Sequence, residues 1–241
     1  MNKGQYRLLF ELENDYWWHV GLRNLIISTY RAYTKNKNNV KILDAGCGTG
    51  GNLVALNKLG YAVGIDLSKE AIYFSKQRGI DKLIEGSVSR LPFKDNCFDV
   101  VLSIDVLYHQ QVYDDIIALK EFHRVLKKNG VLILHLPAFE FLRGPHDKAV
   151  HTQRRYTSSE IKKKLISISF KIEKNTYRIF LFFFIALFLR RLNRKREVIE
   201  FRPLPRWMNR IFIRLINMEN LLINNLNFPF GVSIFTIAEK V

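Results

Sequence analysis

The stretch VKILDAGCGTGGNL, residues 40–53, decides the fold of this chain. It begins with the apolar residues Val40, Ile42 and Leu43, and four glycines follow within nine residues of Ile42. A short apolar run that ends in glycines is typical of a buried strand followed by a tight turn. Glycine permits positive φ and lets a ligand approach the backbone. We therefore expect a strand, a glycine turn and then a helix whose free N–H groups face a ligand.

Glycines in a turn can be required for the backbone conformation alone. The functional prediction therefore depends on the neighbouring strand. The apolar run Tyr61–Ile65 ends in Asp66, sixteen residues after Gly50. A carboxylate at the end of the second strand can accept hydrogen bonds from both hydroxyls of a ribose. The order strand, glycine turn, helix, strand and acid therefore predicts a nucleoside-binding unit.

The wording LDAGCGTG, followed by VGIDLSKEAI, resembles the Rossmann-like S-adenosylmethionine-dependent methyltransferases, over roughly residues 11–169 and again in the last strand. A dinucleotide oxidoreductase would more often show Gly-x-Gly-x-x-Gly. The resemblance implies an α/β fold with a seven-stranded sheet and helices on both faces. A helical insertion before the last strand is also expected, as a departure from the family's minimal pattern. It also implies that S-adenosyl-L-methionine is the cofactor and S-adenosyl-L-homocysteine the product. The residues implied to bind it here are Asp44, Gly46, Cys47, Gly48, Gly50, Asp66 and Leu67.

Two later segments complete the implied cofactor site. GSVSRLPF resembles the family's Gly-Asp-Ala-x-x-Leu-Pro-Phe segment, but Ser87 stands where the family has the acid that binds adenine. The adenine contact is therefore expected at Ser87 or at the backbone around Val88. The predicted strand Phe98–Ile104 ends in polar side chains, which should face the same cleft because ligands bind at the carboxyl ends of such strands. These side chains are Ser103, Asp105, Tyr108 and His109.

The first 34 residues read as a helical segment that contains Trp17, Trp18 and Arg23. Asp15 is a candidate helix cap, and Leu22, Leu25 and Ile26 fit one apolar face. In similar methyltransferases an aromatic and arginine pair covers the methionine end of the cofactor, so we expect a lid. The alternative is that the tryptophans anchor the core.

The loop PHDKAVHTQRRY, after the fifth predicted strand, is the expected acceptor site. It resembles a subset of these enzymes that act on lipids, quinones or saccharide precursors. The residues expected to bind the acceptor are Tyr108, His146, Asp147, His151, Arg154, Arg155 and Tyr156. Methyl transfer to a hydroxyl needs a base, and His146, His151 or His109 could serve. Upstream, the segment KKNG is expected to end a helix.

Residues 179–189, IFLFFFIALFL, form an apolar run followed directly by RRLNRKR. A spanning helix needs about 20 apolar residues, so this run is too short to cross a bilayer. Its phenylalanines should point all round a helix, which favours insertion into a membrane surface. From Arg190 to Arg214 there are nine Lys or Arg against Glu197 and Glu200, within a net charge of +16. Trp207 begins a second, amphipathic basic helix, and such segments bind anionic membranes. The alternatives are a substrate cap, a dimer interface or RNA binding.

The four expected parts are an N-terminal helical lid (1–34), the cofactor-binding core (35–176), the basic apolar insertion (177–227) and the final strand of the core (228–241). The predicted function is O-methylation of a lipid, quinone or lipid-linked saccharide at a membrane surface. A soluble small-molecule or RNA acceptor and a non-catalytic cofactor-binding scaffold are the alternatives. The sequence lacks a secretory signal pattern, and its two cysteines have no metal-ligand spacing. We therefore expect no metal, and a cytoplasmic protein bound peripherally at the inner face of the membrane. The sequence leaves the oligomeric state open.

Overall fold

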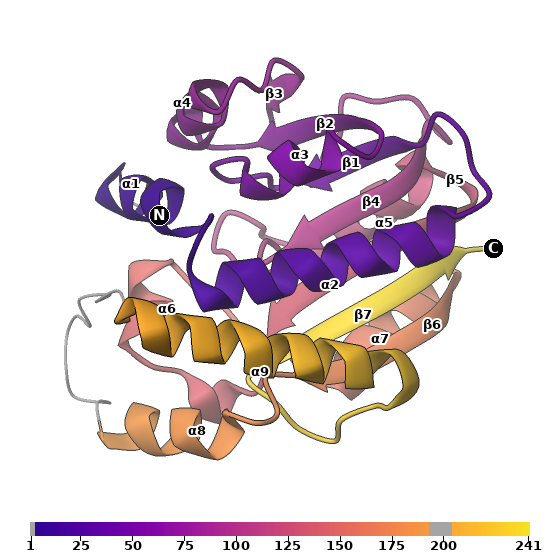
Figure 1. Ribbon diagram of the computed structural model, residues 1–241. Helices are drawn as coiled ribbons and strands as arrows, with labels where there is room; N and C mark the ends of the chain where they lie inside the picture. The colour runs from indigo at the N-terminus through magenta and orange to yellow at the C-terminus, as the bar shows by residue number, and fades with distance from the viewer. Residues whose placement is uncertain (1–2, 193–203) are drawn as a thin grey trace.

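The computed structural model describes residues 3–192 and 204–241 and contains one seven-stranded sheet (Figure 1). The strands are β1 (Lys41–Ala45), β2 (Tyr61–Asp66), β3 (Leu83–Glu85), β4 (Phe98–Ile104), β5 (Leu126–Pro137), β6 (Phe170–Arg178) and β7 (Ser233–Lys240). Their order is β3-β2-β1-β4-β5-β7-β6, and β7 runs antiparallel to both β5 and β6, whereas the other neighbouring strands are parallel. The order reverses direction beside β1, where the carboxyl ends of β1 and β4 leave room for a ligand.

Helices cover both faces of this sheet. They are α1 (Lys3–Leu12), α2 (Trp17–Thr34), α3 (Gly51–Leu56), α4 (Lys69–Gln77), α5 (Asp115–Val125), α6 (Pro145–Ala149), α7 (Ser158–Ser167), α8 (Phe183–Leu192) and α9 (Arg206–Asn225), with a short 3₁₀ turn at Glu140–Leu142. Helices α2, α3 and α9 pack on one face, and α5 and α7 on the other (Figure 1). The expected Rossmann-like class, with seven strands and a helical insertion before the last strand, is confirmed.

Alternation along the strands explains the two-sided core. In β1, Ile42 belongs to the hydrophobic cluster under α2 and α3, whereas Leu43 belongs to the cluster under α5 and α7. Both side chains are fully buried, because a central strand has a helix layer on each side. From α2, the predicted face of Leu22, Leu25 and Ile26 is buried, as expected.

The insertion contains α8 and α9, which lie next to each other at the lower edge of the molecule in Figure 1. The expectation that its phenylalanines point all round one helix is wrong. Residues 179–182 precede α8, and Phe182 and Phe183 pack inward, whereas Phe184 and Phe188 are exposed. The two sides differ because only one side of α8 faces the domain. Within the described part of the chain, no helix has the length and apolarity needed to cross a membrane.

Helix α9 lies along α2 and supplies the cap that the sequence assigned to Asp15 (Figure 1). The backbone N–H of Trp17 donates to Oδ1 of Asn209 at 2.9 Å, and Nδ2 of Asn209 donates to the carbonyl of Asp15 at 2.7 Å. The prediction for Asp15 is therefore wrong, because a residue from the distant helix satisfies the helix start. Gly21 permits this close packing, since a Cβ there would overlap Ile216.

The expectation for KKNG is also wrong. Helix α5 ends at Val125, and the next residue, Leu126, already pairs with Phe98 in the sheet. Lys127 extends from β5 to the carboxylate of Asp99, with Nζ and Oδ2 2.8 Å apart. Pairing of β5 with β4 therefore overrides the local helix-stop pattern. Sequence periodicity could not reveal this pairing, because it joins residues that are distant in the chain.

Candidate functional site

The glycine turn after β1 holds the backbone close to the neighbouring loops. Gly46 has φ of 89°, and a Cβ at this position would overlap the side chain of Val106 from the loop after β4. Gly48 has φ of 54°, and a Cβ there would meet only Leu9 Cδ2, at 3.8 Å. The turn therefore needs glycine at 46 for close packing and for positive φ, while the space beside Gly48 is more open.

Asp44, the last polar residue of β1, is buried with both carboxylate oxygens lacking a hydrogen-bond partner. Burial, with smaller contributions from Asp66 and Glu13, raises the pKa of Asp44 to about 7. Native proteins seldom leave a buried carboxylate unpaired, because the desolvation cost is high. Beside it on β4, the buried Oγ of Ser103 also lacks a partner. The edge of the sheet thus offers unsatisfied acceptors, which suit a ligand with a positive charge.

Asp66 is fixed by the backbone on both sides. Its Oδ2 accepts the N–H of Gly48 and its Oδ1 accepts the N–H of Ser68, both at 2.9 Å. Burial raises its pKa, and these hydrogen bonds oppose that rise. The next residue, Leu67, is exposed, whereas Cys47 is buried under the turn. The carboxylate is therefore held beside the glycine turn.

Ser87 and Val88 lie in the loop after β3, at the same edge of the sheet. The N–H of Ser89 donates to the Oγ of Ser87 at 3.2 Å, and the side chain of Val88 is buried. The serine hydroxyl is thus used to shape its own loop. Whether it also contacts adenine stays a prediction.

Helix α1 lies against the glycine turn, and the sequence gave no indication of this contact. Glu13, at the end of α1, is buried and accepts a hydrogen bond from Thr49, and its carboxylate lies 2.7 Å from the guanidinium of Arg78. Arg23 of α2 donates to the carbonyl of Glu13 at 2.6 Å. These contacts hold the N-terminal segment over the turn.

The two tryptophans differ in their surroundings. The ring of Trp17 packs against Phe182 and Phe212 of the insertion, and its buried Nε1 has no hydrogen-bond partner. The ring of Trp18 lies edge-on to His135, with 6.2 Å between the ring centroids. Trp18 is therefore the tryptophan nearer to the polar residues at the ends of β4 and β5.

Asp105, His135 and Ser233 form a connected polar chain at the ends of three strands. Oδ1 of Asp105 lies 3.0 Å from Nδ1 of His135, and Nε2 of His135 lies 2.9 Å from Oγ of Ser233. His135 and Ser233 are buried, whereas the Asp105 side chain is 31% exposed. Sequence reasoning missed His135 and Ser233, although a histidine inside the apolar strand LILHLP is a usable signal. The chain fixes the orientation of the Asp105 carboxylate.

Several titratable side chains surround Asp105. Burial lowers the pKa of His19 to about 4, lowers that of His146 and raises that of Tyr108, with Asp105 a further influence on all three. By residue exposure, His19 and Tyr108 are half-buried, whereas His146 is exposed. We call the region around His19, Asp105, Tyr108 and His146 the inner recess.

Three residues of the 146–156 loop are engaged within the protein. Asp147 and Arg155 form a buried bidentate ion pair, with Nε and Oδ1 2.8 Å apart. The buried hydroxyl of Tyr156 donates to Asp115 or to the carbonyl of Leu107, each at 3.0 Å. These side chains hold the loop against the core.

The remaining residues of the loop lie farther out. Arg154 pairs with Asp115 at 3.2 Å, and its side chain is 30% exposed. His151 is exposed, with its ring 5.9 Å from that of His109. Burial lowers the pKa of His109 to about 4, and its Nδ1 accepts the N–H of Gln111. Asp105 influences the pKa of His146, which places this histidine beside the inner recess.

Comparison with known proteins assigns the central part of the chain. Residues 43–134 match the family model described as "Methyltransferase domain". Over 108 residues the chain is 41% identical to a protein of Bacillus subtilis (strain 168) assigned as a 23S rRNA (guanine-N(1)-)-methyltransferase; the match covers 42% of this chain and 35% of the relative. Over 105 residues it is 37% identical to demethylmenaquinone methyltransferase of Staphylococcus aureus (strain MRSA252), covering 40% and 43%. The chain thus spans less than half the length of these curated relatives.

A solved structure extends the likeness to the whole fold. The crystal structure of an S-adenosylmethionine-dependent methyltransferase from Thermotoga maritima aligns with 99% of this chain and 96% of its own, with a TM-score of 0.60 and 20% identity. At this identity the likeness concerns the fold alone. It includes the elements outside residues 43–134.

Proposed function

Residues 43–134 are a methyltransferase domain of the Rossmann-like, S-adenosylmethionine-dependent class, and from this premise we propose that the chain transfers a methyl group to an acceptor at a membrane surface. The unpaired carboxylate of Asp44 beside the glycine turn is the observation that carries the proposal. The narrower subset suggested by the 146–156 loop stays a prediction.

The residues at the turn fit S-adenosylmethionine. Asp44 would hold the ammonium of its methionine part, because a buried carboxylate without a partner gains most from a cation. Asp66, already oriented by Gly48 and Ser68, would accept the ribose hydroxyls. Gly46, Gly48 and Gly50 would let the backbone approach the ligand, and Ser87, Val88, Leu67 and Cys47 would border the adenosine part. Helices α1 and α2 would cover it, with Arg23 in the lid.

When bound, S-adenosylmethionine supplies a methyl group on an already activated sulfonium. The protein then has to align the acceptor with that methyl group and exclude water. The inner recess adjoins the glycine turn through Val106, which follows Asp105 and packs on Gly46. An acceptor in this recess would therefore lie between the donor and the residues Tyr108, His146 and Asp105.

His146 is the proposed base if the acceptor is a hydroxyl. Burial lowers its pKa, so the ring is neutral at physiological pH and can take a proton. His109 and His151 are weaker candidates, because they pair with each other outside the recess. Tyr108 and Arg154 are proposed to contact the acceptor, whereas Asp147, Arg155 and Tyr156 would shape the loop that holds it.

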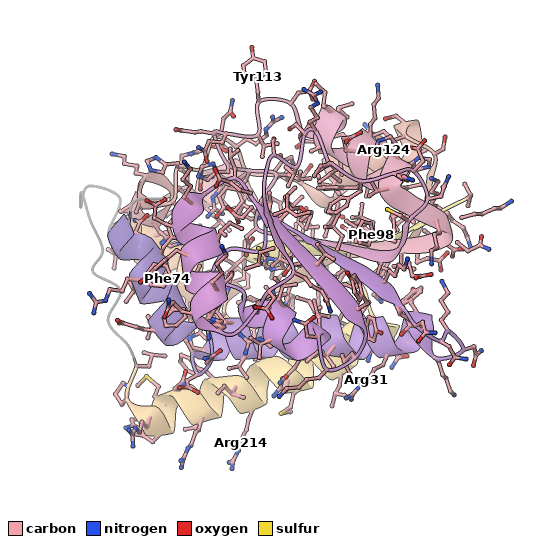
Figure 2. The ribbon with its side chains drawn as sticks, turned by 90° about the horizontal axis from the view of Figure 1, so that it is seen from above. Arg31, Phe74, Phe98, Tyr113, Arg124 and Arg214 are labelled. Carbon is pink, nitrogen blue, oxygen red and sulfur yellow. The ribbon has the colours of Figure 1, made fainter. Side chains whose placement is uncertain are left out.

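The exposed side of α8 supports binding to a membrane. Its large apolar residues Phe184, Ile185, Phe188 and Leu192 are 57–66% exposed and follow helical spacing. Exposed arginines flank them on α8 and α9. Among these, Arg214 points away from α9 (Figure 2). Apolar insertion next to cationic side chains favours an anionic lipid surface over RNA, which would require exposed aromatics on a polar surface. We infer that this side lies on the inner face of the membrane and gives access to lipid, quinone or lipid-linked saccharide acceptors.

Replacing Phe184 and Phe188 together with serine should weaken binding to liposomes that contain anionic lipid about 10-fold or more, because each ring loses its apolar insertion. Cosedimentation measures the change. Tyr113→Ser is the matched control, since Tyr113 is an aromatic residue that is 89% exposed and lies at the opposite edge from Arg214 in Figure 2. Equal liposome binding by the double variant and the control would contradict a membrane role for α8.

The proposed function is tested by calorimetry with S-adenosylmethionine and by methyl transfer from labelled donor to a lipid extract. We expect binding and a labelled lipid product, which mass spectrometry identifies. Transfer of the label to RNA and not to the lipid extract would favour RNA methylation. This is the second candidate function, because the Bacillus relative is assigned as a 23S rRNA methyltransferase. Cofactor binding without transfer to either acceptor would favour the non-catalytic scaffold.

The same transfer assay tests the base. The substitution His146→Ala should lower turnover about 100-fold or more and leave the affinity for S-adenosylmethionine unchanged. His151→Ala is the control from the same loop, because the ring of His151 lies against that of His109 and not beside Asp105. Unchanged turnover in His146→Ala would remove His146 from the mechanism.

A further inference from the structure

The guanidinium of Arg178, at the end of β6, is fully buried, and all three of its nitrogens lack a hydrogen-bond partner. Burial lowers its pKa to about 10, so it remains charged at physiological pH. A buried cation without hydrogen bonds is costly, and proteins keep such groups where a partner or ligand compensates the charge. Sequence reasoning did not identify Arg178, although an arginine within the strand NTYRIF is unusual.

Two carboxylates, those of Glu219 and Asp105, influence the pKa of Arg178, and both already have other hydrogen-bond partners. Glu219 of α9 accepts the backbone N–H groups of Ile179 and Leu181. Asp105 pairs with His135. Both influence the pKa of Arg178, but neither forms a hydrogen bond with it. The ring of Trp18 is a further neighbour, with its centroid 6.0 Å from the guanidinium carbon, and one terminal nitrogen lies against Gly21. None of these contacts satisfies the N–H donors of Arg178.

Arg178 lies near the inner recess. It influences the pKa of His19, as Asp105 does, and the ring of Trp18 contacts both Arg178 and His135. Solvent reaches His19, Trp18 and Asp105. Trp18 is in the first turn of α2, and binding of an anion to the guanidinium would require its ring to move aside.

We propose that Arg178 binds a carboxylate or phosphate group of the methyl acceptor. The planar guanidinium offers five N–H donors in a fork that matches either anion, and pairing in a desolvated site strengthens the contact. This inference rests on the proposed function and narrows it: the acceptor is a hydroxylated compound that carries an anionic group. Cationic neighbours agree with this class, since Arg190 near Asp147 also has its pKa lowered by burial, to about 10.

The test measures the melting temperature of the full chain at constant ionic strength with butyrate, butyl phosphate or butanol. At ten times the dissociation constant, the anion that Arg178 prefers should raise the melting temperature by about 3–5 °C, and butanol should not. The response to butyrate against butyl phosphate tells a carboxylate from a phosphate acceptor. In Arg178→Met the rise should disappear, and in Arg178→Lys it should be reduced but present.

Arg214→Met is the matched control, because Arg214 is exposed on α9, and it should keep the full response (Figure 2). A rise that persists in Arg178→Met, or no rise in the unaltered protein with either anion, overturns the proposal. If Arg178→Met does not fold, the comparison of Arg178→Lys with the unaltered protein decides. Calorimetry with S-adenosylmethionine on the same proteins keeps the two questions apart, since a failed anion response with intact cofactor binding leaves the proposed function standing.

Discussion

Asp44→Asn is expected to stabilise the ligand-free protein above pH 7 and to weaken binding of S-adenosylmethionine about 10- to 100-fold. The folded protein keeps the Asp44 carboxyl protonated up to a pKa of about 7, against an ordinary value of 3.8. Between these pH values the folded chain binds more protons than the unfolded chain, so the free energy of unfolding falls as pH rises. The loss amounts to about 4 kcal/mol by pH 8. Asparagine removes this loss, because it carries no charge to desolvate.

Urea denaturation at pH 4 and pH 8 measures the stability, and calorimetry measures the affinity. Asp99→Asn is the matched control, because Asp99 is paired with Lys127 and lies at the start of β4, away from the glycine turn. It should lower stability slightly and leave cofactor binding unchanged. Asp44→Asn protein that binds S-adenosylmethionine as tightly as the unaltered protein would show that Asp44 does not hold the cofactor.

Removing one member of the Asp147–Arg155 pair should cost about 3–5 kcal/mol of stability. Both side chains are 3% exposed or less, so Asp147→Ala leaves a buried guanidinium that still donates to the carbonyl of Ala138 but has lost its anionic partner. Although burial raises the pKa of Asp147, Arg155 brings it below its ordinary value. Urea denaturation of Asp147→Ala, Arg155→Met and the double variant measures the coupling, and the double variant should lose less than the sum of the two single losses.

Glu173→Ala is the control for this cycle, since the pair of Lys171 and Glu173 includes a lysine side chain that is 62% exposed. Its stability should change by about 0.5 kcal/mol or less. The outcome also decides what the loop residues do. If Asp147→Ala were as stable as the unaltered protein but failed to methylate the acceptor, the pair would belong to the binding site and not to the framework of the loop.

Local patterns were sufficient where function depends on neighbouring residues in the chain. The glycine turn and Asp66 are brought together by one strand–helix–strand unit, so spacing alone predicted their proximity. The strand Phe98–Ile104 was predicted with its observed bounds, because a buried central strand reads as one apolar run. The start of α2 was mispredicted for the opposite reason, since its cap comes from Asn209, 192 residues away.

The residues of the inner recess show the same limit. His135 and Ser233 are 98 residues apart and meet only because β7 pairs with β5. Arg178 reads in the sequence as the end of a strand. Its lack of hydrogen-bond partners follows from how α2 and α9 close over it, which involves Trp18 and Glu219.

The sequence by itself determined the Rossmann-like class and the proposed place of the donor, because periodicity and glycine spacing are local properties of the chain. The tertiary structure decided which loop residues are framework and which face the recess, and it exposed the unpaired groups Asp44 and Arg178. Burial decides whether a charge has a partner, and burial depends on packing between distant elements. For that reason the acceptor site could be described only after the chain was folded.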